Sequence, residues 1–183
     1  SKYIWDITGF PNGDKLLAMP DNTLMRFDGE TYSNFSEAYG LEELYVYDLY
    51  LASKNRLWIS SDNGLYQINL EAKKSERLSE EDGLPSNEVY YVFEETDGTK
   101  WIGTSYGLSV FDGENFQNFR VRDGLADNQI NFITKSPNGN IWLATGGGVS
   151  MFEPDESNKP LVIHNFDKSD GMKLVNSHFI WFD

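Results

Sequence analysis

Two aspartates, Asp6 and Asp48, lie 42 residues apart at equivalent positions of a repeating pattern. Two neighbouring carboxylates can bind a cation or a polar ligand, and they can serve as the acid and the base of glycoside hydrolysis. Neither aspartate lies in a distinctive catalytic motif, so we expect no catalytic residue in the chain. The pair is a candidate ligand-binding site if the fold brings both carboxylates to adjacent strands.

Other residue types give little support for metal or covalent chemistry. The chain has no cysteine, and His164 and His178 are isolated in β-rich segments. The acidic turn at 112–115 lacks the twelve-residue spacing of a calcium-binding EF-hand loop. We therefore expect no metal site and no cofactor.

The composition limits the possible partners. The chain of 183 residues carries a net charge of −14, which argues against nucleic acid and against direct contact with an anionic membrane. No segment approaches the roughly 20 apolar residues of a membrane span, and the start shows no signal peptide. The hydrophobic fraction of 39% and the aromatic fraction of 15% suffice for a sizeable core.

The strands that would position these residues are predicted by a repeat. An apolar dipeptide, led by tryptophan in three of four cases, recurs at spacings of 41–43 residues, and a turn residue stands three positions before each copy. The dipeptides begin at Leu16, Trp58, Trp101 and Trp142. Short strands and turns with this period are typical of β-propeller blades. We expect the three tryptophans to fill the layers between blades.

The pattern predicts an all-β fold, a β-propeller fragment of about four four-stranded antiparallel blades in a single array. The predicted blades cover approximately residues 1–41, 42–84, 85–125 and 126–172. The segment 176–183 aligns with 87–94, so 173–183 is predicted to begin a fifth blade with its first strand.

The same residues carry a family resemblance. The stretch Glu81-Asp-Gly-Leu-Pro-Ser-Asn-Glu-Val-Tyr, the stretch Asp97-Gly-Thr-Lys-Trp-Ile-Gly-Thr and the stretch Gly107-Leu-Ser-Val-Phe-Asp closely resemble the two-component regulator propeller repeat. The fourth unit matches from Asp123 to Phe152, the second is looser, and the first departs most.

The resemblance implies a non-catalytic segment of the extracytoplasmic, periplasmic sensor region of a bacterial hybrid two-component histidine kinase. Propellers of that family are usually seven-bladed, and many of these regulators detect oligosaccharides. The implied partners are an oligosaccharide and the remainder of the sensor protein.

If the first strand of each blade is innermost, the loops before it and the turns between the second and third strands share one face. Amide, hydroxyl and aromatic groups there suit sugar hydroxyls. Single Asn and Asp residues on such loops can equally be turn caps. The candidate ligand-binding residues are Asp6, Asp48, Asn63, Asn87, Tyr106, Asn128, Asn131 and Asn176.

Two other functions stay open. The blades can form a protein-interaction scaffold, or the chain can be a propeller lyase or glycosidase.

Four blades do not complete a seven-bladed disc, and an open array leaves an apolar face at each end. We therefore expect a homodimer that joins these open ends.

Overall fold

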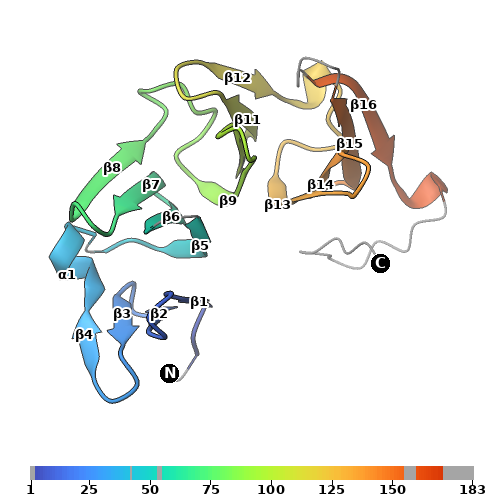
Figure 1. Ribbon diagram of the computed structural model, residues 1–183. Coiled ribbons are helices and arrows are strands. Elements are labelled where there is room, and N and C mark those ends of the chain that lie inside the picture. The colour runs from blue at the N-terminus through green and yellow to red at the C-terminus, as the bar shows by residue number, and fades with distance from the viewer. Residues whose placement is uncertain (1–2, 42, 53–54, 155–159, 171–183) are drawn as a thin grey trace. The chain divides into compact units, whose positions relative to one another are not determined.

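The strands that the structure describes form four antiparallel four-stranded sheets (Figure 1). The structure, a computed structural model, describes residues 3–41, 43–52, 55–154 and 160–170. The strands of each sheet follow one another in chain order, so each sheet is a simple meander. The predicted first strand of a fifth blade and Asn176 lie outside the described residues.

The sheets correspond to the four predicted units. The first contains β1 (Asp6–Gly9), β2 (Lys15–Ala18), β3 (Leu24–Phe27) and β4 (Tyr32–Asn34). The second contains β5 (Val46–Ala52), β6 (Arg56–Ser61), β7 (Gly64–Asn69) and β8 (Lys74–Leu78). The third contains β9 (Val89–Glu94), β10 (Lys100–Thr104), β11 (Gly107–Phe111) and β12 (Phe116–Phe119). The fourth contains β13 (Ile130–Lys135), β14 (Ile141–Thr145), β15 (Val149–Pro154) and β16 (Pro160–Phe166).

Within the described residues, helix is confined to short segments, which confirms the all-β prediction. These segments are α1 (Phe35–Tyr39), η1 (Val121–Asp123) and η2 (Lys168–Asp170). Helix α1 follows the fourth strand of the first sheet and is not part of the predicted four-stranded blade pattern. The Asn34 side chain caps this helix by accepting from the Glu37 N–H, and Gly40 ends it in the left-handed region.

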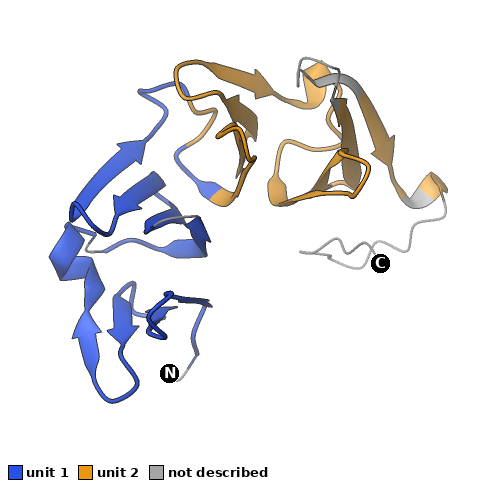
Figure 2. Ribbon diagram, in the orientation of Figure 1, with its two compact units in different colours: residues 1–83, 87–89 blue, residues 84–86, 90–183 orange. Residues whose placement is uncertain are grey.

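The chain divides into two compact units, which Figure 2 shows in different colours. Unit 1 contains residues 1–83 and 87–89, and unit 2 contains residues 84–86 and 90–183. Each unit has its own apolar core between two sheets.

In unit 1, the two sheets pack face to face. Leu16, Ala18 and Leu24 of the first sheet share a buried cluster with Leu49 and Ile59 of the second. Strand β1 also lies against β5. Each sheet thus buries one face on its neighbour, as propeller blades do.

The core of unit 2 has the same construction around Trp101. This tryptophan is 2% exposed and shares a cluster with Ile133, Leu143 and Phe152 of the fourth sheet. Its ring meets the Phe152 ring edge-on, with the centroids 5.5 Å apart. Trp101 therefore lies between two blades, as predicted.

The other two tryptophans differ from each other. Trp58 is fully buried, whereas Trp142 is only half-buried and stacks on Phe166 of its own sheet. These contacts do not confirm for Trp142 the prediction that every repeated tryptophan fills an inter-blade layer.

A small residue follows each repeated dipeptide, and in unit 2 it permits close approach of the next blade. In unit 2 this residue is Gly103, where an added Cβ would lie 2.8 Å from the Ile130 carbonyl oxygen and 2.9 Å from its Cγ2. The equivalent residues in the other sheets are Ala18, Ser60 and Ala144, all nearly inaccessible to solvent. A larger side chain at Gly103 would push β13 away from β10.

We predict that Trp101→Ala destabilises the protein by about 3–5 kcal/mol, because it leaves a large cavity between two blades. Trp142→Ala should cost less, since that side chain is less completely buried than Trp101. Urea unfolding of both variants measures the difference. Equal losses for the two variants would contradict the assignment of Trp101 to the inter-blade layer.

We also predict that Gly103→Ala lowers the free energy of unfolding by about 1–3 kcal/mol through overpacking against Ile130. The matched control is Gly9→Ala, where the nearest atom to the new Cβ is the end of the flexible Lys15 side chain. Chemical unfolding should show little change for Gly9→Ala. A neutral Gly103→Ala would show that the blades do not depend on this close approach.

Candidate functional site

The loops before the inner strands and the turns between second and third strands share an edge, as the sequence predicts. In unit 1, the Gly64 N–H donates to the Asn87 carbonyl oxygen at 2.6 Å. In unit 2, the Ser86 and Ser105 hydroxyls lie 3.0 Å apart, and the Gly146 N–H donates to the Gln129 carbonyl at 2.9 Å.

Two of the candidate asparagines hold these loops in shape. The Asn87 side-chain oxygen accepts from the Glu80 N–H at 2.8 Å, and the Glu80 carboxylate accepts from the Asn87 N–H at 2.8 Å. The Asn128 side-chain oxygen accepts from the Val121 N–H at 2.9 Å in the same arrangement, also over seven residues. Both side-chain oxygens therefore serve the connection into the next blade.

The remaining loop candidates lie on turns or on an inner strand. The Asn63 amide donates to the Tyr66 hydroxyl at 3.2 Å. Tyr106 is 52% exposed, with the Arg120 guanidinium 4.5 Å from its ring centroid. Asn131 lies where the β13–β14 register shifts, and its side-chain oxygen accepts from Gln129.

The structure brings Asp6 and Asp48 to neighbouring inner strands of unit 1. Asp6 accepts from the N–H of Leu49 at 2.7 Å and from the N–H of Ile7 at 2.8 Å, one bond to each oxygen. Asp6 thus joins β1 of the first sheet to β5 of the second. Burial, with a smaller contribution from the Asp6 charge, raises the pKa of Asp48 to about 8.

This arrangement differs from an open pair of catalytic carboxylates. Both Asp6 oxygens are engaged by backbone N–H groups, and one Asp48 oxygen is buried without a hydrogen-bond partner among the described residues. In the described part of the chain, no cluster of three or more His, Asp or Glu residues could hold a metal ion. In this pair, Asp48 is suited to holding a proton, and Asp6 is suited to accepting hydrogen bonds from backbone N–H groups.

A cavity of about 470 Å³ lies elsewhere in unit 1. Its residues come from β3, from α1 and from the β1–β2, β5–β6 and β7–β8 connections. We call it the Arg26 pocket, and it is lined by Phe10, Pro11, Asn12, Arg26, Tyr39, Asn55, Leu70 and Glu71. Its volume lies within the range of small-molecule sites, roughly 300–1,000 Å³.

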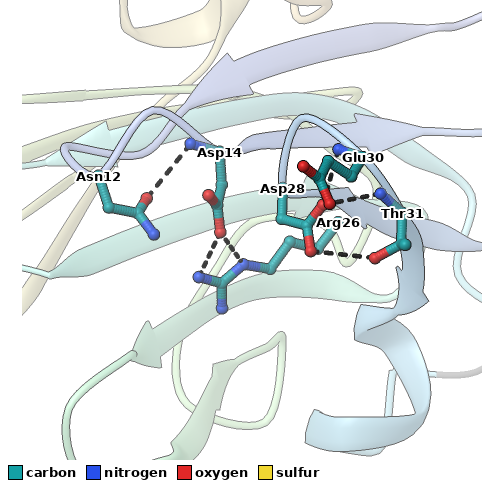
Figure 3. Close-up of polar contacts among 6 residues, drawn as sticks. All are labelled: Asn12, Asp14, Arg26, Asp28, Glu30 and Thr31. Carbon is teal, nitrogen blue, oxygen red and sulfur yellow. Dashed lines mark hydrogen bonds and ion pairs between the residues drawn. The ribbon is translucent and has the colours of Figure 1, made fainter.

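The charge of Arg26 is balanced within the blade. Two guanidinium nitrogens contact one oxygen of the nearly buried Asp14, Nε at 2.6 Å and Nη2 at 2.5 Å (Figure 3). The Asn12 side chain accepts from the Asp14 N–H at 3.3 Å and so connects the turn to the ion pair. Nearby, Asp28 organises the β3–β4 turn by accepting from the Glu30 and Thr31 N–H groups, which lowers the pKa of its carboxyl.

Aromatic rings support the pocket. The Arg26 guanidinium lies 5.2 Å from the Phe10 ring centroid, and Phe10 contacts Phe35 with the centroids 6.3 Å apart. Phe35 in turn stacks on Tyr39 at 4.5 Å. Partial burial raises the pKa of the Tyr39 hydroxyl, so this hydroxyl is a neutral hydrogen-bonding group.

The repeat does not predict this pocket, because helix α1 departs from the repeat there. Tyr39 lies on that helix, and the other lining residues are scattered over loops of two blades. The Asn12-Gly13 turn was visible in the sequence, but only as a hairpin signal. A second cavity of about 480 Å³ is lined by residues of polar type, which are Asp21, Asn22, Thr23, Asn34, Ser36 and Glu43.

Comparisons with solved structures show which proteins share this fold. The extracellular domain of a hybrid two-component system of B. thetaiotaomicron, BT3049, has a TM-score of 0.81 and 24% identity, over 97% of this chain and 24% of that chain. The extracellular domain of BT4673 from the same organism has a TM-score of 0.72 and 21% identity, over 88% and 21%. This chain therefore spans about a quarter of the length of these two proteins.

The fold also occurs in an enzyme. An inactive virginiamycin B lyase from Staphylococcus aureus has a TM-score of 0.67 and 15% identity, over 90% of this chain and 55% of the lyase.

Among curated proteins, no match to the chain was found. None of the described helices is long and apolar enough to cross a membrane.

A family model matches the connection into the fourth sheet and its first two strands. The match covers residues 124–147, and the model describes the two component regulator propeller. It includes Asn128, β13 and β14, the residues on which the resemblance was based in this unit. Residues 124–147 are therefore similar to a two component regulator propeller repeat.

Proposed function

We propose that the chain is a non-catalytic ligand-sensing segment of an extracytoplasmic two-component sensor, and that its ligand is an oligosaccharide. The regulator-propeller repeat and the structural similarity to sensor extracellular domains support the sensor role. The remainder of the sensor protein is then the partner that receives the signal.

The Arg26 pocket is the observation that carries the ligand assignment. A sugar ring presents an apolar face together with several hydroxyls, which need paired donors and acceptors. Tyr39 supplies an aromatic surface, while Asn12, Asn55 and Glu71 supply polar groups around it. The ion pair with Asp14 balances the Arg26 charge, so an uncharged polyhydroxyl ligand fits the pocket better than an anion.

The geometry favours binding over catalysis. An acid–base pair must reach the scissile bond, and Asp6 and Asp48 do not present two available carboxylates. Within the Arg26 pocket, Glu71 and Arg26 are the charged lining residues. This set lacks the second carboxylate that glycoside hydrolysis uses.

We predict that one class of oligosaccharide raises the melting temperature of the chain and binds in calorimetry. Tyr39→Ala should weaken that binding roughly tenfold or more, equivalent to about 1.4 kcal/mol. Tyr39→Phe, which keeps the ring and its stacking on Phe35, should retain most of the affinity and report on folding.

The control is Tyr106→Ala, which removes an exposed tyrosine from the edge of the other candidate loops. It should leave affinity unchanged. Binding that is lost in Tyr106→Ala and kept in Tyr39→Ala would move the site to that edge. Absence of binding across plant, host and microbial oligosaccharides would contradict the proposed ligand class.

A second role, in self-assembly, is favoured by the face that carries Ile7. Ile7 pairs with Leu17 in the same register as Leu49 with Ile59 and Ile133 with Leu143. Leu49 and Ile133 are 6% and 1% exposed, whereas Ile7 is 54% exposed. The first sheet thus presents an apolar position that its equivalents bury, and we propose a second copy of the chain as its partner.

We expect light scattering coupled to size exclusion to give twice the mass of one chain at micromolar concentration. Ile7→Lys should shift the mass toward that of a single chain, because it places a charge in the apolar contact. The matched control is Val121→Lys, which changes another half-exposed apolar residue. A single-chain mass for the parent protein would exclude the homodimer.

A further inference from the structure

Asp48 lies in a polar environment that the proposed sensor role does not use. It is opposite Ser60 in the β5–β6 register, so the two side chains share one face of the sheet. Within the described residues, one Asp48 oxygen and the Ser60 hydroxyl are both buried without hydrogen-bond partners. Buried polar atoms are nearly always satisfied, so two unsatisfied atoms on facing residues indicate a feature with a role.

A proton on Asp48 removes this difficulty. A protonated carboxyl has an O–H that can donate, and a hydroxyl such as that of Ser60 can accept through an intervening water. An ionised Asp48 can only accept and must carry its charge in a buried place. The neutral acid is therefore the form that this environment favours.

Among the charged groups around Asp48, Asp6 strengthens this preference. On the β1 side, Asp6 is the neighbouring charge, and it disfavours a second negative charge. On the β6 side, Arg56 is opposite Ala52, four residues further along β5. Glu88 accepts from the hydroxyl of Tyr47 at 2.9 Å and adds a carboxylate to this region.

The contact between β1 and β5 depends on the same group of residues. Asp6 accepts from the N–H of Leu49, the residue that follows Asp48. A charge on Asp48 would therefore appear beside the carboxylate that connects the first two blades. Repulsion between the two carboxylates falls if β1 moves away from β5.

We propose that Asp6, Asp48 and Ser60 form a proton-dependent latch, which holds the first two blades together when Asp48 is protonated and loosens when it ionises. This inference does not depend on the ligand of the Arg26 pocket. The latch makes the junction between the first two blades sensitive to alkaline pH.

The direction of the pH dependence follows from linkage. The folded protein retains the Asp48 proton up to about pH 8, whereas an unfolded chain releases it near 3.8. Between these values the folded state binds more protons, so the free energy of unfolding falls as the pH rises. Above about pH 8 both states are ionised at this residue, and the decline ends.

The test compares the parent protein with Asp48→Asn by chemical unfolding from pH 5 to pH 9. The unfolding equilibrium constant of the parent should rise relative to the variant by up to tenfold per pH unit and level off above about pH 8. The control, Glu114→Gln, makes the same carboxyl-to-amide change on an exposed turn and should show no such divergence.

Two further measurements make the outcome decisive. Carbon NMR should show the Asp48 carboxyl titrating near pH 8. In the parent protein, hydrogen exchange of the Leu49 N–H should accelerate with pH by more than the intrinsic exchange rate does. In Asp48→Asn it should follow the intrinsic rate. Titration of Asp48 below pH 5, or parallel pH profiles, would overturn the proposal. The pH profiles are also measured in sodium chloride and in calcium chloride, with tetramethylammonium chloride at equal ionic strength as the control. If sodium or calcium removes the divergence between the parent and Asp48→Asn, the site binds a cation in place of a proton. That result would also overturn the proposal.

Discussion

The close approach of successive blades is the constraint on which the rest of this structure depends. A four-stranded sheet has two faces, and its apolar residues must be buried against another sheet. In unit 2 this approach is possible because Gly103 leaves room for the backbone of Ile130. In unit 1, Ala18 and Leu24 allow the second sheet to bury Leu49 and Ile59. The inner strands therefore come near enough for Asp6 to reach the N–H of Leu49.

The repeat also explains how one scaffold carries different local chemistry. The inner-strand position held by Asp6 and Asp48 is held by Tyr91 and Phe132 in unit 2, where the two rings contact each other at 4.7 Å. A polar pair in one unit and an aromatic pair in the other thus occupy the same place in the blade pattern. Helix α1 is a comparable local change, since it adds Tyr39 to the wall of a pocket.

Much of the fold could be predicted from the sequence, because its signals are local and repeated. The spacing of Leu16, Trp58, Trp101 and Trp142, together with the Asn-Gly and Asp-Gly turns, is sufficient to predict four meander sheets. For the contact between Asp6 and the second blade, the sequence shows only that Asp6 and Asp48 hold equivalent positions in the first two repeats. Its bond to Leu49 depends on how two sheets pack, and a repeat alone does not specify that contact.

The candidate site was harder to predict for the same reason. Asn87 and Asn128 stand out in the sequence because they recur, yet recurrence is what a structural turn produces. The residues of the Arg26 pocket do not recur. Arg26, Tyr39 and Asn55 come from different elements, and α1, which lies in the connection between the first two sheets, supplies Tyr39. A site formed by residues that do not recur cannot be predicted from the repeat.

The most direct test of the proposed sensor role is an NMR titration of the isotopically labelled chain with the oligosaccharide that stabilises it most. Our account predicts saturable shifts centred on Phe10, Arg26, Tyr39 and Asn55, with little change at Asn63 and Tyr106. Shifts centred on those two residues, or no saturable shifts with any oligosaccharide, would contradict it.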